Sequence, residues 1–368
     1  MRFCLFSTQQ HWGGGEALLK TVGDELQLSG HAVAWVARNH SEVHERIVGQ
    51  SEQLLHATDG RGWNVADWLS VIRVFRQWAP DVLLLNDTHA VPLAGTAAWF
   101  CRRPKPLRLA YKHTIFPLRS KLKYQFLTDK IVCVSQAAFE TLCQGGLGTN
   151  RLAMIYGGCS IPQVEPQTVA TIRHEFNVAG SRRLIVCVGN LLKCKGHAEL
   201  IQAAALLPGN KDLLIVIAGQ GEQEQRLRHM IADLGLSQRV RLLGYRHDAE
   251  QLLAAADLVV HPSHAEGLSL VLIQAQMLGK PIVATAVGGA AEVLNADRPE
   301  DSSCWLAEPR QSADLARAIS QALTELERPD EQWTAKLNAT TQRTLETFSS
   351  RRTGQQLAEL AASLRVQR

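Results

Sequence analysis

The chain has 368 residues, about twice the length of a typical single domain, so two domains are expected. Its hydrophobic content of 46% is enough for two cores, and no apolar run approaches the roughly 20 residues that cross a bilayer, which argues against an integral membrane protein. The eight cysteines include no CxxC pair, so neither a disulfide framework nor a zinc site is expected, and a reduced, cytoplasmic chain is predicted.

The net charge of +4 is unevenly distributed. No Asp or Glu occurs from Thr88 to Thr128, whereas eight basic residues crowd into part of that stretch: Arg102, Arg103, Lys105, Arg108, Lys112, Arg119, Lys121 and Lys123. A positive face there would favour an anionic partner, either a phosphorylated glycolipid or an anionic membrane surface, and a solvated basic surface without a role is the alternative. Nucleic acid is not expected, because no aromatic interleaving or nucleic-acid-binding motif is recognised.

Short apolar runs alternate with helical patterns along the whole chain. Strands are predicted at residues 3–7, 32–36, 82–85, 109–112 and 131–134, and in the second half at 184–188, 213–218, 240–243, 258–261 and 282–285. Helices are predicted at 16–28, 64–77, 136–142, 197–206, 223–234, 249–255, 268–278, 313–327 and 351–366. This alternation predicts an α/β protein with two doubly wound parallel sheets. The segment from Tyr156 to Pro162 contains two glycines and a proline, and the boundary between the two domains is predicted there.

A glycine-rich turn, Gly13-Gly14-Gly15-Glu16, follows the first predicted strand and opens a helix. Gly14 and Gly15 would let the backbone approach a ligand, and the helix start would offer N–H donors to a phosphate, although glycines that only shape a turn give the same pattern. Glu16 is interpreted as a first-turn helix charge rather than a catalytic group. His113, after another predicted strand, is either structural or a neutral imidazole that binds a hydroxyl or takes its proton.

The most informative stretch runs from Ser263 to Pro281. It reads as a loop carrying Glu266 and Gly267, followed by a helix that is apolar on nearly every face and therefore buried. The free N–H groups at the start of such a helix attract anions, whereas a carboxylate beside them more plausibly accepts hydrogen bonds from hydroxyls of the same ligand. A ligand with both phosphates and hydroxyls is most simply a sugar nucleotide. An ordinary loop and core helix is the alternative.

This stretch resembles the donor-site signature of the retaining glycosyltransferases of family 4, which have the GT-B fold. The resemblance extends over nearly the whole chain. It implies two doubly wound Rossmann-like domains with a cleft between them: an acceptor-binding domain over residues 1–162, onto which a C-terminal helix at 348–368 packs back, and a nucleotide-sugar-binding domain over 163–347.

The resemblance also implies roles for individual residues. His113, Glu266 and Lys195 would be catalytic. Residues placed at the donor are Gly14, Gly15, Asn190, Lys193, Gly219, Tyr245, Arg246, Gly267, Leu268, Ser269, Leu270 and Gln274. Two of these depart from the family pattern, which usually has Arg at the position of Asn190 and a second Glu at that of Gln274. Replacing a charged hydrogen bond by a neutral one should cost roughly tenfold in donor affinity.

The predicted function is therefore a retaining, metal-independent hexosyltransferase of the bacterial surface-glycan type, with no cofactor. It would move a sugar from a nucleoside-diphosphate sugar, with a UDP-sugar expected first, to a lipopolysaccharide core or another cell-surface polysaccharide. The predicted location is cytoplasmic, with peripheral contact at the inner face of the membrane. A catalytically impaired nucleotide-sugar-binding scaffold subunit is the alternative that Asn190 and Gln274 motivate, and a sugar-nucleotide epimerase on the same fold is the third hypothesis.

Overall fold

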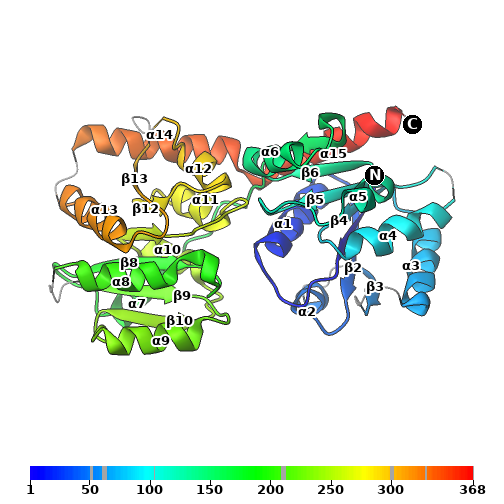
Figure 1. The fold of residues 1–368 in the computed structure, drawn as a ribbon. Coiled ribbons are helices and arrows are strands. Elements are labelled where there is room, and N and C mark those ends of the chain that lie inside the picture. The colour runs from blue at the N-terminus through cyan, green and yellow to red at the C-terminus, as the bar shows by residue number, and fades with distance from the viewer. Residues whose placement is uncertain are drawn as a thin grey trace. The chain divides into compact units, whose positions relative to one another are not determined.

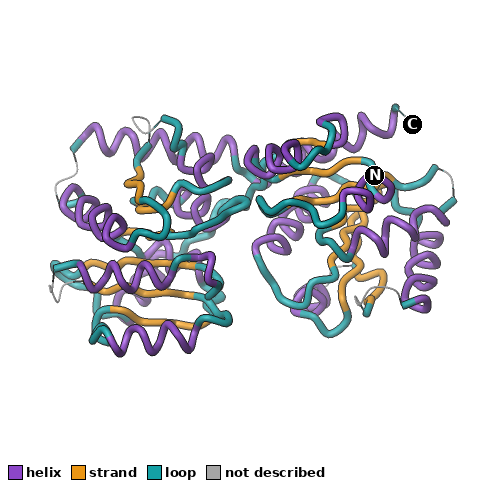
Figure 2. Tube along the Cα trace, viewed as in Figure 1, coloured by secondary structure: helices purple, strands orange, loops and turns teal. Residues whose placement is uncertain are grey.

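The computed structural model describes residues 1–49, 53–59, 64–102, 104–208, 213–298, 302–327 and 330–367 (Figures 1 and 2). The chain divides into two compact units. The first comprises Met1–Ser160 and Phe348–Arg368, and the second comprises Ile161–Thr347. Among the residues that the structure describes, no helix is both long enough and apolar enough to cross a membrane.

The first unit is built on a seven-stranded parallel sheet with the order β3-β2-β1-β4-β5-β6-β7. Its strands are β1 (Arg2–Ser7), β2 (Ala32–Arg38), β3 (Leu54–Thr58), β4 (Val82–Leu85), β5 (Leu107–Lys112), β6 (Lys130–Cys133) and β7 (Leu152–Met154). The crossovers carry α1 (Gly14–Leu28), α2 (Glu42–Gly49), α3 (Val65–Trp78), α4 (Ala90–Ala97), α5 (Lys121–Leu127) and α6 (Gln136–Gln144). The central strand β1 pairs with β2 and β4, and its residues from Phe3 to Phe6 are completely buried.

The C-terminal helix α15 (Ser350–Val366) packs along α1 in this first unit. The Ser350 hydroxyl donates to the Glu25 carboxylate at 2.6 Å, and Arg365 forms an ion pair with Asp81. A Cβ atom at Gly354 would lie 2.7 Å from the Cβ of Glu25, so the close approach of the two helices requires glycine there.

The second unit is built on a six-stranded parallel sheet with the order β10-β9-β8-β11-β12-β13 (Figure 1). Its strands are β8 (Arg183–Val188), β9 (Leu213–Ala218), β10 (Val240–Gly244), β11 (Leu258–His261), β12 (Ile282–Thr285) and β13 (Cys304–Ala307). Its helices are α7 (Pro166–Glu175), α8 (His197–Leu206), α9 (Glu224–Asp233), α10 (Ala249–Ala255), α11 (Leu270–Met277), α12 (Gly289–Leu294), α13 (Ser312–Glu325) and α14 (Glu331–Thr347). In each sheet the strand order reverses once, between β1 and β4 and between β8 and β11.

The predicted α/β class with two doubly wound parallel sheets is confirmed, and each predicted strand is present. Three strands were not predicted: β3, β7 and β13, which are all at sheet edges. Two helix starts are corrected by two residues each. α1 begins at Gly14, not at residue 16. α11 begins at Leu270, not at residue 268, because the Ser269 side chain caps it by accepting a hydrogen bond from the Leu272 N–H at 3.3 Å.

Candidate functional site

Two loops of the second unit meet at its strand-order reversal. The loop after β8 carries Lys195, and the loop after the neighbouring strand β11 carries Glu266. A backbone hydrogen bond of 2.7 Å from the His264 N–H to the Cys194 carbonyl joins the two loops. Doubly wound sheets bind ligands outside the carboxyl ends of their strands at such a reversal, so this is the candidate ligand site of the second unit.

The buried carboxylate of Glu266 is the centre of this site. Its Oε1 accepts hydrogen bonds from Lys195 Nζ at 2.6 Å, from the Ser263 hydroxyl at 2.6 Å and from His261 Nε2 at 2.9 Å. Burial alone would raise the pKa of Glu266, but the hydrogen bond and charge of His261 and the charge of Lys195 outweigh it and lower this pKa to about 2. Glu266 is therefore ionised throughout the physiological pH range, and Lys195 is held beside it.

Three glycines allow the loops of this site to pack closely. Gly196 has φ = +69°, and a Cβ atom there would lie 1.9 Å from the Pro262 carbonyl oxygen. A Cβ atom at Gly219 would lie 1.9 Å from the Gly189 carbonyl oxygen, and one at Gly221 would lie 2.6 Å from that of Leu191. Gly219 thus acts by bringing the loop after β9 against the loop after β8, in addition to any contact with a ligand.

The start of α11 lies beside Glu266 in the same loop. Gly267 and Leu268 precede the helix, Ser269 is its N-cap and Leu270 is its first residue. The helix is mostly buried, as expected, with Leu272, Ile273, Ala275, Gln276 and Met277 inside the core. The first N–H groups of the helix can donate hydrogen bonds to an anion. The N–H of Leu272 is the exception, because it already donates to the Ser269 hydroxyl.

Gln274 has a carboxylate neighbour that sequence reasoning missed. Its Nε2 donates to Glu250 Oε1 on α10 at 2.9 Å. Burial raises the pKa of Glu250, while hydrogen bonds from the Gln163 backbone and from Gln274 oppose that shift. No local pattern marks Glu250, because the contact joins residues 24 positions apart on two helices.

Four other residues that were predicted to bind the sugar-nucleotide donor lie in or near these loops. Asn190 and Lys193 are exposed in the loop after β8, and the Asn190 carbonyl accepts from His197 Nε2 at 3.2 Å. Tyr245 is exposed, whereas the Arg246 guanidinium is held by Asp248 through two hydrogen bonds of 2.8 and 2.7 Å. The guanidinium of Arg246 is therefore already paired with an acidic side chain of its own loop.

In the first unit, the predicted residues Gly14, Gly15 and His113 come together at the start of α1. The N-cap Gly13 offers no side-chain cap, and a Cβ atom at Gly15 would lie 3.3 Å from Cδ2 of His113. Burial, with a contribution from the charge of Lys112, lowers the pKa of His113 to about 4, so its imidazole is neutral near pH 7.

The basic stretch does not form one uniform positive face. Lys112 is buried and donates to the Thr114 hydroxyl at 2.9 Å, and Arg108 pairs with Asp129. Arg103 lies outside the described residues. The exposed basic residues are Arg102, Lys105, Arg119 and Lys121, and exposed apolar side chains accompany them at Phe116, Leu122 and Phe126.

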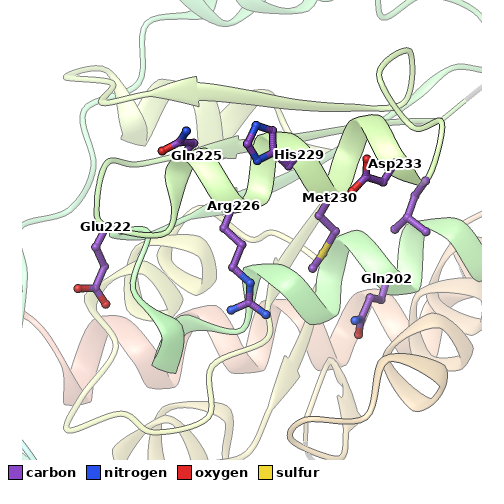
Figure 3. A pocket seen from close by; sticks show the side chains of 8 residues that line it. Gln202, Glu222, Gln225, Arg226, His229, Met230 and Asp233 are labelled. Carbon is purple, nitrogen blue, oxygen red and sulfur yellow. The ribbon is translucent and has the colours of Figure 1, made fainter.

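A groove of about 660 Å³ lies between α8 and α9 of the second unit (Figure 3). Gln202 of α8 and Gln225 and His229 of α9 are among the side chains that line it. None of the predicted site residues is among the residues that line it.

Comparison with known proteins agrees with this architecture. The model for "Glycosyltransferase Family 4" matches residues 12–161, and the model for "Glycosyl transferases group 1" matches residues 169–336. Among solved structures, Anabaena HepE in complex with UDP-glucose has 22% identity, a TM-score of 0.84 and coverage of 99% of this chain and 100% of that chain. WaaG, a glycosyltransferase involved in lipopolysaccharide biosynthesis, has 16% identity and a TM-score of 0.68, covering 98% and 99%.

Curated relatives match over part of the chain. A D-inositol 3-phosphate glycosyltransferase of Mycolicibacterium gilvum is 31% identical over 217 residues, which are 56% of this chain and 48% of the relative. The lipopolysaccharide glucosyltransferase WaaG of Escherichia coli is 27% identical over 224 residues, which are 59% and 57%. The chain thus spans about half the length of the curated relatives it matches.

The two parallel-sheet units define a protein of the GT-B class. With the two family models matched one to each unit, the chain belongs to the family-4 glycosyltransferases.

Proposed function

We propose that the protein is a retaining glycosyltransferase that moves a sugar from a UDP-sugar to an anionic glycan or glycolipid acceptor. The observation that carries the proposal is the cluster at the second unit's strand-order reversal, where Lys195 contacts the ionised Glu266 just ahead of the start of α11. Complexes of HepE with UDP and with UDP-glucose support the choice of base for a chain of the same fold.

In the proposed donor complex, the phosphates lie on Lys195 and on the free N–H groups at the start of α11. The Lys195 ammonium has three donors and gives one to Glu266, so it can also bind a phosphate oxygen. A carboxylate has about four lone-pair positions, so Glu266 keeps acceptor capacity for hydroxyls of the transferred sugar. Its fixed negative charge and that of the diphosphate would hold the ammonium from two sides.

During transfer, the bond from the anomeric carbon to the phosphate oxygen breaks and a bond from that carbon to the acceptor oxygen forms. The acceptor attacks from the side of the leaving group, and its hydroxyl proton passes to the departing phosphate oxygen. Negative charge builds on the released diphosphate, where Lys195 and the helix N–H groups stabilise it without a metal ion. Neutral His113, with Gly14 and Gly15 beside it, would contact sugar hydroxyls from the first unit.

The acceptor assignment is supported by the exposed basic residues Arg119 and Lys121 together with the exposed apolar side chains of Phe116, Leu122 and Phe126. Basic and apolar groups together favour the surface of an anionic membrane, where a lipopolysaccharide core or a similar acceptor would be collected. We propose a cytoplasmic protein that contacts the inner membrane face peripherally. Vesicles with anionic lipid should retain the protein and neutral vesicles should not; equal retention would refute the membrane contact.

The decisive experiment uses the full chain and a panel of sugar nucleotides. A bound donor at 100 times its dissociation constant stabilises a folded protein by about 2.7 kcal/mol, so thermal shift selects the donor. Release of UDP only when a glycan acceptor is added would support transfer, and the anomeric configuration of the product, read by NMR, tests retention. Donor binding with no turnover on any acceptor would favour the scaffold alternative, and a donor that changes configuration without acceptor would favour the epimerase.

A further inference from the structure

A chain of three hydrogen-bonded side chains, two of them buried, connects the start of α1 to the partly buried His113. Asn86 Nδ2 donates to Glu16 Oε1 at 2.9 Å, and His113 Nε2 lies 2.8 Å from Asn86 Oδ1. Only 7% of Glu16 and 4% of Asn86 is exposed. Glu16 is in the first turn of α1, Asn86 follows β4 and His113 follows β5.

The Glu16 carboxylate is fixed as an acceptor. Burial raises the pKa of Glu16, with a contribution from the charge of Asp87, whereas the backbone N–H groups of Glu16 and of the N-cap residue Gly13 and the Asn86 amide oppose that shift. Glu16 is the third residue of the helix, and this reach back to the N-cap N–H is half of a capping box. Because Asn86 Nδ2 donates to Glu16 Oε1, the same amide turns its carbonyl oxygen toward His113.

The orientation of Asn86 then decides where the imidazole proton lies. A carbonyl oxygen only accepts, so the His113 nitrogen that faces it must carry the hydrogen. We propose that Glu16 and Asn86 are positioning residues that hold neutral His113 as the Nε2–H tautomer and leave Nδ1 as the acceptor of the ring. The tautomer follows from these contacts alone, whereas a role for Nδ1 toward a substrate hydroxyl rests on the function proposed above.

The ring of His113 is also held in place by its neighbours. The Tyr111 ring stacks on it with 5.4 Å between centroids and 8° between planes. On α1, the position of a Cβ atom at Gly15 would be only 3.3 Å from Cδ2 of His113. Because packing fixes the ring plane, the tautomer is the property that Glu16 can still control.

The test replaces the carboxylate while keeping its shape, in Glu16→Gln. The backbone N–H groups of Gly13 and residue 16 still need an acceptor, so the new amide oxygen should stay with them and its NH₂ group should face Asn86. Asn86 would then turn its carbonyl to residue 16 and its NH₂ group to His113. The expected result is a change of His113 to the Nδ1–H tautomer, read from ¹⁵N-histidine NMR of the full chain. His113→Asn identifies the His113 signal by its loss.

A second variant keeps the inference falsifiable if the first disturbs folding. In the double variant, Glu16→Gln with Asn86→Asp, the carboxylate is at position 86 and the amide is at position 16. The carboxylate introduced at position 86 accepts from both the new amide and Nε2, so the Nε2–H tautomer should return. Asp24→Asn removes one charge from the same helix at a partly exposed pair with Lys20, and it should leave the His113 signal unchanged.

Turnover separates this inference from the proposed function. If both hold, Glu16→Gln lowers kcat by about tenfold, the effect of one lost hydrogen bond, and the double variant restores it. A tautomer that follows residue 16 without any sugar transfer would support the positioning role and refute the proposed function. An Nδ1–H signal in the parent protein, or an unchanged Nε2–H signal in Glu16→Gln, would overturn the positioning role whatever the activity.

Discussion

The side-chain amide of Gln274 donates a hydrogen bond to the carboxylate of Glu250, with 2.9 Å between Nε2 and Oε1. At the position of Gln274, family members usually have a carboxylate, and in this chain a carboxylate lies one hydrogen bond away on α10. The carboxylate of Glu250, on the neighbouring helix α10, therefore still faces position 274 in this part of the second unit.

This relationship predicts that restoring the family residue alone fails. In Gln274→Glu, two carboxylates would lie within hydrogen-bonding distance, so one of them should take up a proton and its pKa should rise. We expect at most a twofold change in UDP affinity, measured by calorimetry, and a loss of about 1 kcal/mol in the free energy of unfolding.

The exchanged pair, Glu250→Gln with Gln274→Glu, keeps one amide and one carboxylate in contact. It moves the charge onto α11, and we expect UDP to bind about tenfold more tightly than to the parent protein. Tenfold tighter binding by the single variant, at unchanged stability, would show that Glu250 has no influence on position 274.

Lys195 and Lys193 lie in the same loop and provide a matched comparison. Lys195 contacts the buried Glu266, whereas Lys193 is exposed. Lys195→Ala should reduce sugar transfer at least a hundredfold, because it removes the cation that the leaving diphosphate needs. Lys193→Ala should retain transfer within about threefold. Initial rates of UDP release test both, and unchanged turnover in Lys195→Ala would refute its assigned role.

The lowered pKa of Glu266 predicts that the stability of the second unit decreases as the pH falls below about 4.5. The pKa falls from an ordinary 4.5 to about 2 on folding, so the unfolded chain binds a proton that the folded chain does not. The stabilisation is therefore complete above about pH 4.5 and is lost as the pH falls toward 2, by an amount on the order of 3 kcal/mol. Urea unfolding between pH 3 and 7 measures it.

Glu266→Gln should flatten that dependence. Glu224→Gln is the control, because Glu224 forms an exposed pair with Arg228 within one helix. The interpretation is wrong if the slope between pH 3 and 4.5 is the same in Glu266→Gln as in the parent protein.

A comparison of alanine substitutions at Gly196 and Gly235 distinguishes the cost of backbone strain from the cost of a steric conflict. Both have positive φ, +69° and +67°, so a substitution by alanine at either position costs about 1 kcal/mol in backbone conformation. At Gly235 no atom lies within 4 Å of the added Cβ, whereas at Gly196 the Pro262 oxygen lies 1.9 Å from it. Gly196→Ala should therefore cost about 3 kcal/mol or more and weaken donor binding. Equal losses in thermal unfolding would refute the steric argument.

Among the strands that the structure describes, the sequence predicted every central strand and missed three of the four edge strands, for a physical reason. Strands such as β4 and β9 are flanked on both sides and read as unbroken apolar runs, VLLL and LLIVIA. The missed strands β3, β7 and β13 have one neighbour each, and their sequences are shorter or mixed, as in LAM. A strand at the edge of a sheet needs less apolar sequence, and the local signal weakens accordingly.

Residue type and loop position singled out Glu266 and Lys195, and the structure brings these two side chains into contact, whereas their roles in binding and catalysis stay predictions. Glu16 was interpreted as a helix charge, yet it is buried and bonded to Asn86, 70 positions away. Such a contact depends on which loops meet at the strand-order reversal of the first sheet. Local sequence patterns do not contain that information.

The packing of α15 against α1 has a consequence for biosynthesis. The second unit is one continuous stretch of chain, whereas the first is completed by residues that leave the ribosome after all of it. Until then, the face of α1 around Glu25 has no α15 to cover it. The first unit can therefore be completed only after the whole second unit has been synthesised, and a truncation near residue 348 would leave α1 without the helix that packs on it.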